Sequence, residues 1–172
     1  MSTNDELSQR LTRAYAEILE HAHDALEQAR DETLPNLRSL LEVARKKAVH
    51  VGQISRDDAE KLAEYIHRDI VHAAVYLESG QRNLSDWLRF DIQKIERRGA
   101  QVLATMVDHT RETLDDLANT ADSLGWKTGE VVGPGTLHCK NCGQALHFHE
   151  AGHIPPCPKC HHAMFARDHD VS

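Results

Sequence analysis

The sequence predicts a mainly α fold: an elongated antiparallel helical hairpin or bundle, followed by a small β module. Residues 1–125 are rich in Ala, Leu, Glu, Asp and Arg, which suits long helices, and they carry 16 basic and 23 acidic side chains. The rest of the chain is electrically balanced and holds all four cysteines. We therefore expect a helical region at 1–124, a glycine-rich linker or first hairpin at 125–135, and a cysteine module at 136–172.

Apolar side chains at steps of three and four predict the first three helices. A first helix at about 4–32 has a stripe that runs from Leu7 to Ala29, and Pro35 separates it from a second helix at about 35–51. The segment "SRDD" opens the third helix, because Ser55 is a suitable N-cap and acids favour the first turn of a helix. This helix is expected to end at Gly80.

A fourth helix is predicted from about Asn83 to about Leu124, with apolar residues that alternate in steps of four and three. Such a coiled-coil seam on one straight helix of about 40 residues would be about 60 Å long. The short links between helices favour antiparallel neighbours. An intramolecular core is the simpler interpretation of these stripes, and a homo-oligomer formed through the helices is the alternative.

Two features of the helical region invite a functional interpretation but do not require one. The basic patches "ARKK" and "ERRG" are flanked by acids, which is typical of a solvated helix face. Isolated histidines lie on the expected helices, and a ligand role is not expected for them. These are His67, His72 and His109.

The character of the sequence changes at "LGWKTGEVVGPGTL", where glycine and proline break the helix and valines favour extended backbone. Short strands are predicted at about 136–139, 145–150 and 163–167. Their apolar side chains offer only a minimal core, formed by Leu137, Leu146, Phe148 and Phe165. A module of about 45 residues rarely folds on such a core alone.

All four cysteines lie in two CxxC pairs: Cys139 with Cys142, and Cys157 with Cys160. Each pair forms a tight turn that directs two sulfurs at one ion, and together they supply the tetrahedral shell of one structural Zn²⁺. The small β module is therefore predicted to be a zinc ribbon. Iron is the alternative that four thiolates also permit.

Four protein thiolates close the coordination shell, whereas a catalytic zinc keeps one position for water. Other histidines of the module are potential competing ligands or second-shell donors; these are His138, His153, His161 and His162. His147 and His149 share one strand face, which suits a second ion, an anion or simply exposure to solvent. The sequence contains no Ser/His/Asp arrangement, P-loop, GxGxxG or HExxH motif, so it predicts no enzyme and no catalytic residue.

The segments "GEVVGPGTLHCKNC" and "CPKC", together with the helical N-terminal part, resemble the YbeL-like family of bacterial zinc-ribbon proteins, a domain family of unknown function. The resemblance implies that the four cysteines are metal ligands. It also assigns an approach loop to Gly129, Glu130, Gly133 and Gly135. One departure is His161, which follows the second pair where such ribbons often have glycine. Histidine enters the positive-φ region of that turn at some cost.

These observations favour a non-enzymatic interaction or adaptor protein that docks on a larger cytoplasmic assembly, with an unidentified protein partner. The alternative is a regulator that binds nucleic acid or the transcription machinery through cations of the ribbon, namely Lys127, Lys140, Lys159 and Arg167. A third interpretation is an enzyme or metal-handling protein that uses the histidine-rich tail. A polar N-terminus and the lack of a long apolar run predict a cytoplasmic location without membrane contact.

Overall fold

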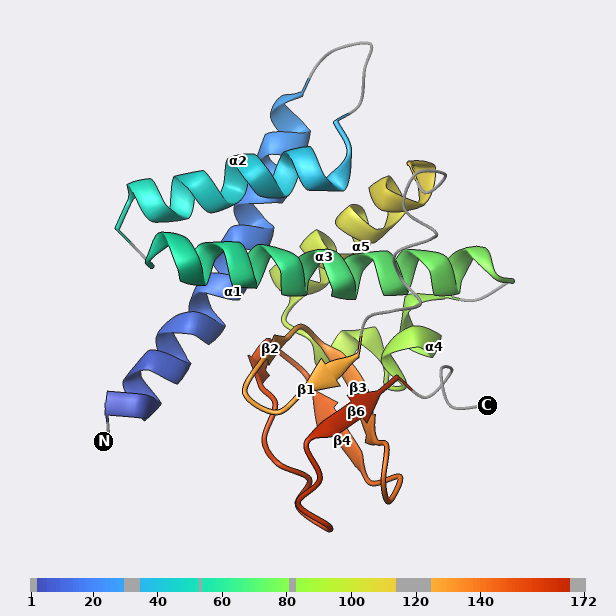
Figure 1. Ribbon diagram of the computed structural model, residues 1–172. Coiled ribbons are helices and arrows are strands. Elements are labelled where there is room, and N and C mark those ends of the chain that lie inside the picture. The colour runs from blue at the N-terminus through green and yellow to red at the C-terminus, as the bar shows by residue number, and fades with distance from the viewer. Residues whose placement is uncertain (1–2, 30–34, 53, 81–82, 114–124, 168–172) are drawn as a thin grey trace.

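In the computed structural model, helices form one end of the molecule and a β ribbon forms the other (Figure 1). The described residues are 3–29, 35–52, 54–80, 83–113 and 125–167. The helices are α1 (Thr3–Gln28), α2 (Leu37–His50), α3 (Arg56–Glu78), α4 (Leu84–Leu88), the 3-10 turn η1 (Ile92–Lys94) and α5 (Arg97–Glu112). The predicted fold class, a helical bundle followed by a zinc ribbon, is confirmed.

Side-chain caps set the starts of the helices. Asn36 accepts a hydrogen bond from the Ser39 amide at α2. Ser55, the predicted N-cap, accepts one from the Asp58 amide at α3. Each cap satisfies an amide that the first turn leaves without a partner.

The prediction of a single helix from Asn83 to Leu124 is wrong, because α4 ends at Leu88 and α5 begins only at Arg97. Arg89 takes a left-handed conformation at φ 63° and closes α4. Glu96 then accepts hydrogen bonds from two amides and starts α5 as a separate helix. Leu88 is fully buried in the helical core, and its carbonyl accepts a hydrogen bond from the Thr136 hydroxyl of the ribbon. The predicted part beyond residue 113 lies outside the described residues.

Helix α3 runs across the molecule in Figure 1, with α2 antiparallel beside it, α1 crossing both, and α4 on the side of α3 that faces the ribbon. The expected stripe of α1 is buried only in its middle, where Tyr15, Ile18 and Ala22 are at most 2 % exposed. Leu7, near the start of α1, is 41 % exposed. The helices therefore share a core that ends before the first turns of α1.

The strands form two antiparallel sheets. Four strands pair in the order β1 (Trp126–Lys127), β6 (Met164–Ala166), β3 (Gly135–Cys139) and β4 (Ala145–Phe148). The second sheet pairs β2 (Val131–Val132) with β5 (Gly152–His153). The segment 125–135 thus supplies one strand to each sheet, and each of these strands pairs with a later part of the chain.

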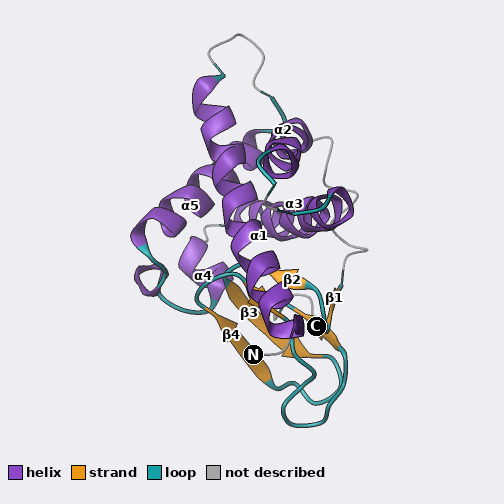
Figure 2. Cartoon of the chain, turned by 90° about the vertical axis from the view of Figure 1, so that its left-hand side faces the viewer, coloured by secondary structure: helices purple, strands orange, loops and turns teal. Residues whose placement is uncertain are grey.

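The ribbon, which lies below most of the helices in Figure 2, has a small core of its own. Of the four residues expected there, Leu137 and Phe165 are fully buried, whereas Leu146 and Phe148 pack at its edge. Trp126, Cys139 and Cys157 complete much of the remaining core. Because two of its buried members are cysteines, this core depends on what the cysteines bind.

Candidate metal centre

The four predicted cysteine ligands come together at one end of the ribbon. Their sulfur atoms all lie within 4.8 Å of one another. The Cys139 and Cys160 sulfurs are 3.5 Å apart, as are those of Cys142 and Cys157. A disulfide would require a separation of about 2.05 Å, whereas a tetrahedral site with Zn–S bonds of about 2.3 Å places sulfurs about 3.8 Å apart. The arrangement fits one metal ion with four thiolate ligands.

Two matching turns position the sulfurs. In the first, the Gly143 amide donates to the Cys139 carbonyl at 2.9 Å; in the second, the His161 amide donates to the Cys157 carbonyl at 2.8 Å. Gly143 has φ 79° and His161 has φ 64°. The structure therefore places His161 in the left-handed region that its position after the second CxxC pair predicts.

Hydrogen bonds and desolvation shift the pKa values of the thiols in opposite directions. The Asn141 side chain and the His162 amide lower the pKa of Cys160 to about 6. At Cys142 the Gln144 amide acts to lower the pKa, but desolvation and the other three cysteines raise it to about 12. Four thiolates this close need a cation in order to ionise together, and a bound metal ion such as zinc would supply that charge.

The predicted histidine alternatives lie elsewhere. Thr136 donates its hydroxyl hydrogen to the Leu88 carbonyl at 2.7 Å, so His147 Nδ1 is the donor in its 2.9 Å contact with Thr136 Oγ1. His149 packs edge-on against Phe90. Both histidines are exposed and lie beside Thr136 and Phe90, respectively, not beside the cysteines. Among the described residues, the four cysteines form one potential metal-ligand group, and the other is a partly exposed trio on α1 formed by His23, Asp24 and Glu27.

A second set of buried polar side chains, which the sequence analysis did not identify, joins the ribbon to the helices. Asp69 of α3 is 2 % exposed. It accepts hydrogen bonds from the Tyr15 hydroxyl at 2.6 Å, Trp126 Nε1 at 2.9 Å and the Gly133 amide at 2.9 Å. We call the surrounding set the Asp69 cluster; its members are Tyr15, Arg68, Asp69, Trp87, Trp126, Glu130 and Arg167.

Two buried arginines balance the acids of the Asp69 cluster. Arg68 donates to Asp69, Glu130 and the Val131 carbonyl. Arg167, which is fully buried, lies 3.7 Å from Asp69. Burial opposes ionisation of Asp69, but the two guanidinium groups hold its pKa below the ordinary value. Burial and the Asp69 charge raise the pKa of Tyr15 well above its ordinary value.

Aromatic rings and one glycine fix Arg167 in place. Its guanidinium carbon lies 4.2 Å from the ring centre of Trp87 and 5.1 Å from that of Trp126. A Cβ atom on Gly135, which has φ 145°, would lie 1.9 Å from Arg167 Nη1. Gly135 is therefore required for the close approach of β3. The almost complete burial of Arg68, Asp69 and Arg167 leaves no room for a substrate, so the contacts of the Asp69 cluster are structural.

The sequence contained a signal for this cluster in "YIHRDIV". Asp69 lies three residues after Ile66 and four before Ala73, so it falls on the apolar face of α3. A charged residue on a buried face requires a partner. Arg68 is adjacent in the sequence, but the other partners could not be read, because they come from α1, β1, Gly133 and the residue after β6.

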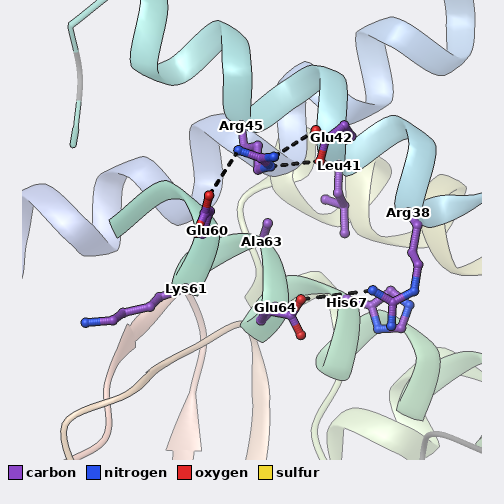
Figure 3. Close-up of a pocket in the computed structure, with 9 residues that line it drawn as sticks. All are labelled: Arg38, Leu41, Glu42, Arg45, Glu60, Lys61, Ala63, Glu64 and His67. Carbon is purple, nitrogen blue, oxygen red and sulfur yellow. Dashed lines mark hydrogen bonds and ion pairs between the residues drawn. The ribbon is translucent and has the colours of Figure 1, made fainter. Parts of the chain in front are cut away.

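Two grooves on the described surface bear on function. The first, of about 450 Å³, lies between α2 and α3 (Figure 3). There Arg45 pairs with Glu42 at 2.7 Å and with Glu60 at 3.8 Å, which agrees with the expected solvated face. Burial and the neighbouring Arg38 lower the pKa of His67, at the base, to about 4.

The second groove, of about 770 Å³, lies at the junction of α1, α5 and the ribbon. We call it the junction groove. Its walls include Leu19, Val102 and Leu103 from the helices and Pro134 and Phe148 from the ribbon. Since both regions contribute walls, the groove exists only when the ribbon is docked on the helices.

The fold and the cysteine site together define the class: a helical protein that ends in a zinc ribbon. The chain matches the model of a zinc-ribbon containing domain over residues 24–169. It is 31 % identical over 140 residues to the uncharacterized protein YbeL of Escherichia coli strain K12, which covers 77 % of this chain and 82 % of that protein. YbeL of the CFT073 and O157:H7 strains matches equally well. The chain therefore belongs to the YbeL-like zinc-ribbon family, as its resemblance predicted.

No solved structure matches the chain. Among its described residues, no helix is both long and apolar enough to cross a bilayer.

Proposed function

We propose that this protein is a non-enzymatic adaptor, which docks on a larger cytoplasmic assembly through its zinc ribbon. The supporting observation is the combination of a closed four-cysteine site with exposed turns around it. Lys140, Pro158, Lys159 and His161 are all exposed around the cysteines. The turn between β3 and β4 and the loop between β5 and β6 lie at the end of the ribbon away from α2 (Figure 1).

This arrangement suits recognition better than chemistry. Four sulfurs fill a tetrahedral shell, so a metal ion held there has no position for a substrate or a water nucleophile. The metal instead holds two short loops rigid, and a rigid loop loses little conformational entropy when it binds a partner. In this proposal the metal ion stabilises the conformation of the two cysteine turns, and the exposed side chains of these turns contact the partner.

Site-specific photo-crosslinking in cells tests the adaptor function. A photo-reactive residue would replace Lys159, exposed in the second cysteine turn, and Gln101, exposed on α5, would be the matched control position. We expect defined protein adducts from position 159 that are absent at position 101. Adducts that never rise above background at position 159, or that are the same at both positions, would contradict docking through the ribbon.

Binding to nucleic acid or the transcription machinery is the second candidate. Residues 139–163 contain two lysines and one acid, Glu150, so this end is basic relative to the helices. However, Arg167, one of the four cations expected to contact phosphate, is fully buried, and its assignment to phosphate contact is wrong. With Lys127, Lys140 and Lys159 remaining, direct affinity would be weak and salt-dependent.

A mobility-shift titration at low salt tests direct nucleic-acid binding. Binding by the wild-type chain that is lost in a Lys140→Glu, Lys159→Glu double variant would favour the second candidate. A complete absence of shift would exclude simple nucleic-acid binding and leave docking on a protein of the transcription machinery to the crosslinking experiment.

A further inference from the structure

The four-cysteine site and the Asp69 cluster are connected by two steps across one sheet. Cys139 pairs with Phe165 between β3 and β6, and Phe165 pairs with Trp126 between β6 and β1. Trp126 then donates its indole N–H to Asp69. Because backbone pairing fixes the register of these strands, the first cysteine turn and the Asp69 cluster have fixed relative positions while the sheet is intact.

A second connection runs along β3 and β6. Immediately after Cys139, the Lys140 amide donates to the Met164 carbonyl at 3.0 Å. Strand β6 ends at Ala166, one residue before Arg167 enters the cluster. At the opposite end of β3, Gly135 provides the space that Arg167 occupies. Strand β3 thus holds a metal ligand at one end and the site of Arg167 at the other.

The ribbon cannot maintain these connections on its apolar core alone. Its buried core contains seven residues, of which Cys139 and Cys157 are two. Small modules of this type draw much of their folding free energy from the metal. When the metal leaves, β1 and β6 lose the order that brings Trp126 and Arg167 to Asp69.

We propose that metal loading of the four-cysteine site and docking of the ribbon on the helices are linked equilibria, with the Asp69 cluster as the link. Removal of the metal releases the ribbon from α3 and α4 and separates the two walls of the junction groove. The surface that the protein presents to a partner therefore depends on its metal content. Linkage is reciprocal, so weakening the Asp69 cluster also weakens metal binding.

The two tryptophans of the chain report on this linkage, because Trp87 and Trp126 both lie in the Asp69 cluster and each is 1 % exposed. Trp126→Phe leaves Trp87, on the helical side, as the single emitter. After a chelator removes zinc from this full-length variant, we expect a red shift of Trp87 fluorescence with most helical circular dichroism retained. Added Zn²⁺ should reverse the shift. An emission that does not change when the cysteines lose their metal would overturn the proposal.

Trp126→Phe removes one hydrogen bond of the Asp69 cluster, so hydrogen exchange of the wild-type chain provides a test without any substitution. Peptides that contain residues 66–73 of α3 should exchange faster after metal removal, because Asp69 loses its ribbon donors. Peptides from α2 serve as the internal control, because no described hydrogen bond joins α2 to the Asp69 cluster. Equal exchange of residues 66–73 with and without zinc would overturn the linkage independently of any substitution.

Zinc affinity tests the reciprocal direction. In competition with a chromophoric chelator, Asp69→Asn should weaken Zn²⁺ binding by about 5- to 150-fold, the usual range of coupling between linked sites. Asp57→Asn, an exposed substitution in the first turn of the same helix, should leave affinity unchanged. Equal affinity of both variants would overturn the proposal. If Asp69→Asn does not fold, the wild-type exchange experiment decides the question.

Discussion

The four-cysteine site and the Asp69 cluster share one small sheet but are assembled in opposite ways. The cysteines lie within one stretch from Cys139 to Cys160, in two local turns that bring the four sulfurs together. The Asp69 cluster gathers side chains from α1, α3, α4 and both ends of the ribbon. The first site is defined by spacing along the chain, whereas the second is defined only by packing of distant elements.

The energetics of the two sites differ as well. A structural metal adds its binding free energy directly to folding. A buried set of charges is weak evidence for net stability, because desolvation offsets the attraction, but removal of one member leaves the others unpaired. Under the proposed linkage, a bound metal stabilises the ribbon and the Asp69 cluster fixes where the ribbon sits.

The largest effect is expected from Cys142→Ser. The variant should lose its metal and unfold the ribbon, because structural zinc contributes about 10–16 kcal/mol in small zinc modules. Most helical circular dichroism should remain, since the helices bury a core of their own. Metal analysis and circular dichroism of the purified variant check both statements. Loss of most helix signal would mean that the two regions fold as one unit.

Asp69→Asn should lower the free energy of unfolding by about 3–5 kcal/mol, the usual cost of breaking a buried ion pair. The lowered pKa of Asp69 means that its contribution is present above the pKa of the unfolded chain and is lost as pH falls through the folded value. Urea unfolding at neutral pH measures the difference. Asp57→Asn should change stability by less than about 0.5 kcal/mol, and similar values for both variants would contradict a special role for Asp69.

A comparison of Gly135→Ala with Gly129→Ala separates the cost of crowding Arg167 from the cost of placing alanine at a positive φ. Both glycines have positive φ, but a Cβ atom on Gly129 would have no neighbour within 4 Å, whereas one on Gly135 would meet Arg167 at 1.9 Å. We expect Gly135→Ala to be less stable than Gly129→Ala by about 1–3 kcal/mol, as for other overpacked sites. Thermal unfolding compares them. Equal stability would show that Arg167 moves away without cost.

His67 predicts a pH dependence on the helical side. Because burial and Arg38 lower its pKa to about 4, the unfolded chain takes up a proton first as pH falls from about 6.5. The contribution of neutral His67 to the free energy of unfolding is therefore complete above about pH 6.5 and is lost as the pH falls toward about 4. Unfolding at several pH values should show a shallower decline in His67→Gln than in the wild type. His50→Gln, at an exposed position, should keep the wild-type slope; a common slope in all three would contradict the assignment.

The smallest effect is expected at the second cysteine turn. His161→Gly relieves a left-handed conformation that costs about 1–2 kcal/mol and adds unfolded-chain entropy of about 0.5–1 kcal/mol. The net result should be a gain of about 0.5–1 kcal/mol in unfolding free energy. Gly143→Ala, at the equivalent position of the first turn with φ 79°, should have the opposite sign. Destabilisation by His161→Gly would indicate that the imidazole makes a contact that stabilises the turn.

The sequence by itself determined the local features of this protein. Helical periodicity located α1, α2 and α3, and Ser55 marked the start of α3, because caps and stripes depend on residues a few positions apart. The spacing of the cysteine pairs brought four sulfurs together for the same reason. The YbeL-like resemblance added the order of the parts and no settled activity.

Tertiary structure decided what joins those parts. The periodicity at 83–124 suited one long helix, yet α4 ends at Arg89. The short helix α4 contacts the ribbon through the Trp87 ring, which lies against Arg167, and through the Leu88 carbonyl, which accepts from Thr136. Arg167 resembled a surface cation, but its charge is buried against Asp69. The physical reason is common to both: a local pattern records which side chains tend to be buried, whereas the partner of a buried charge depends on which distant segments pack together.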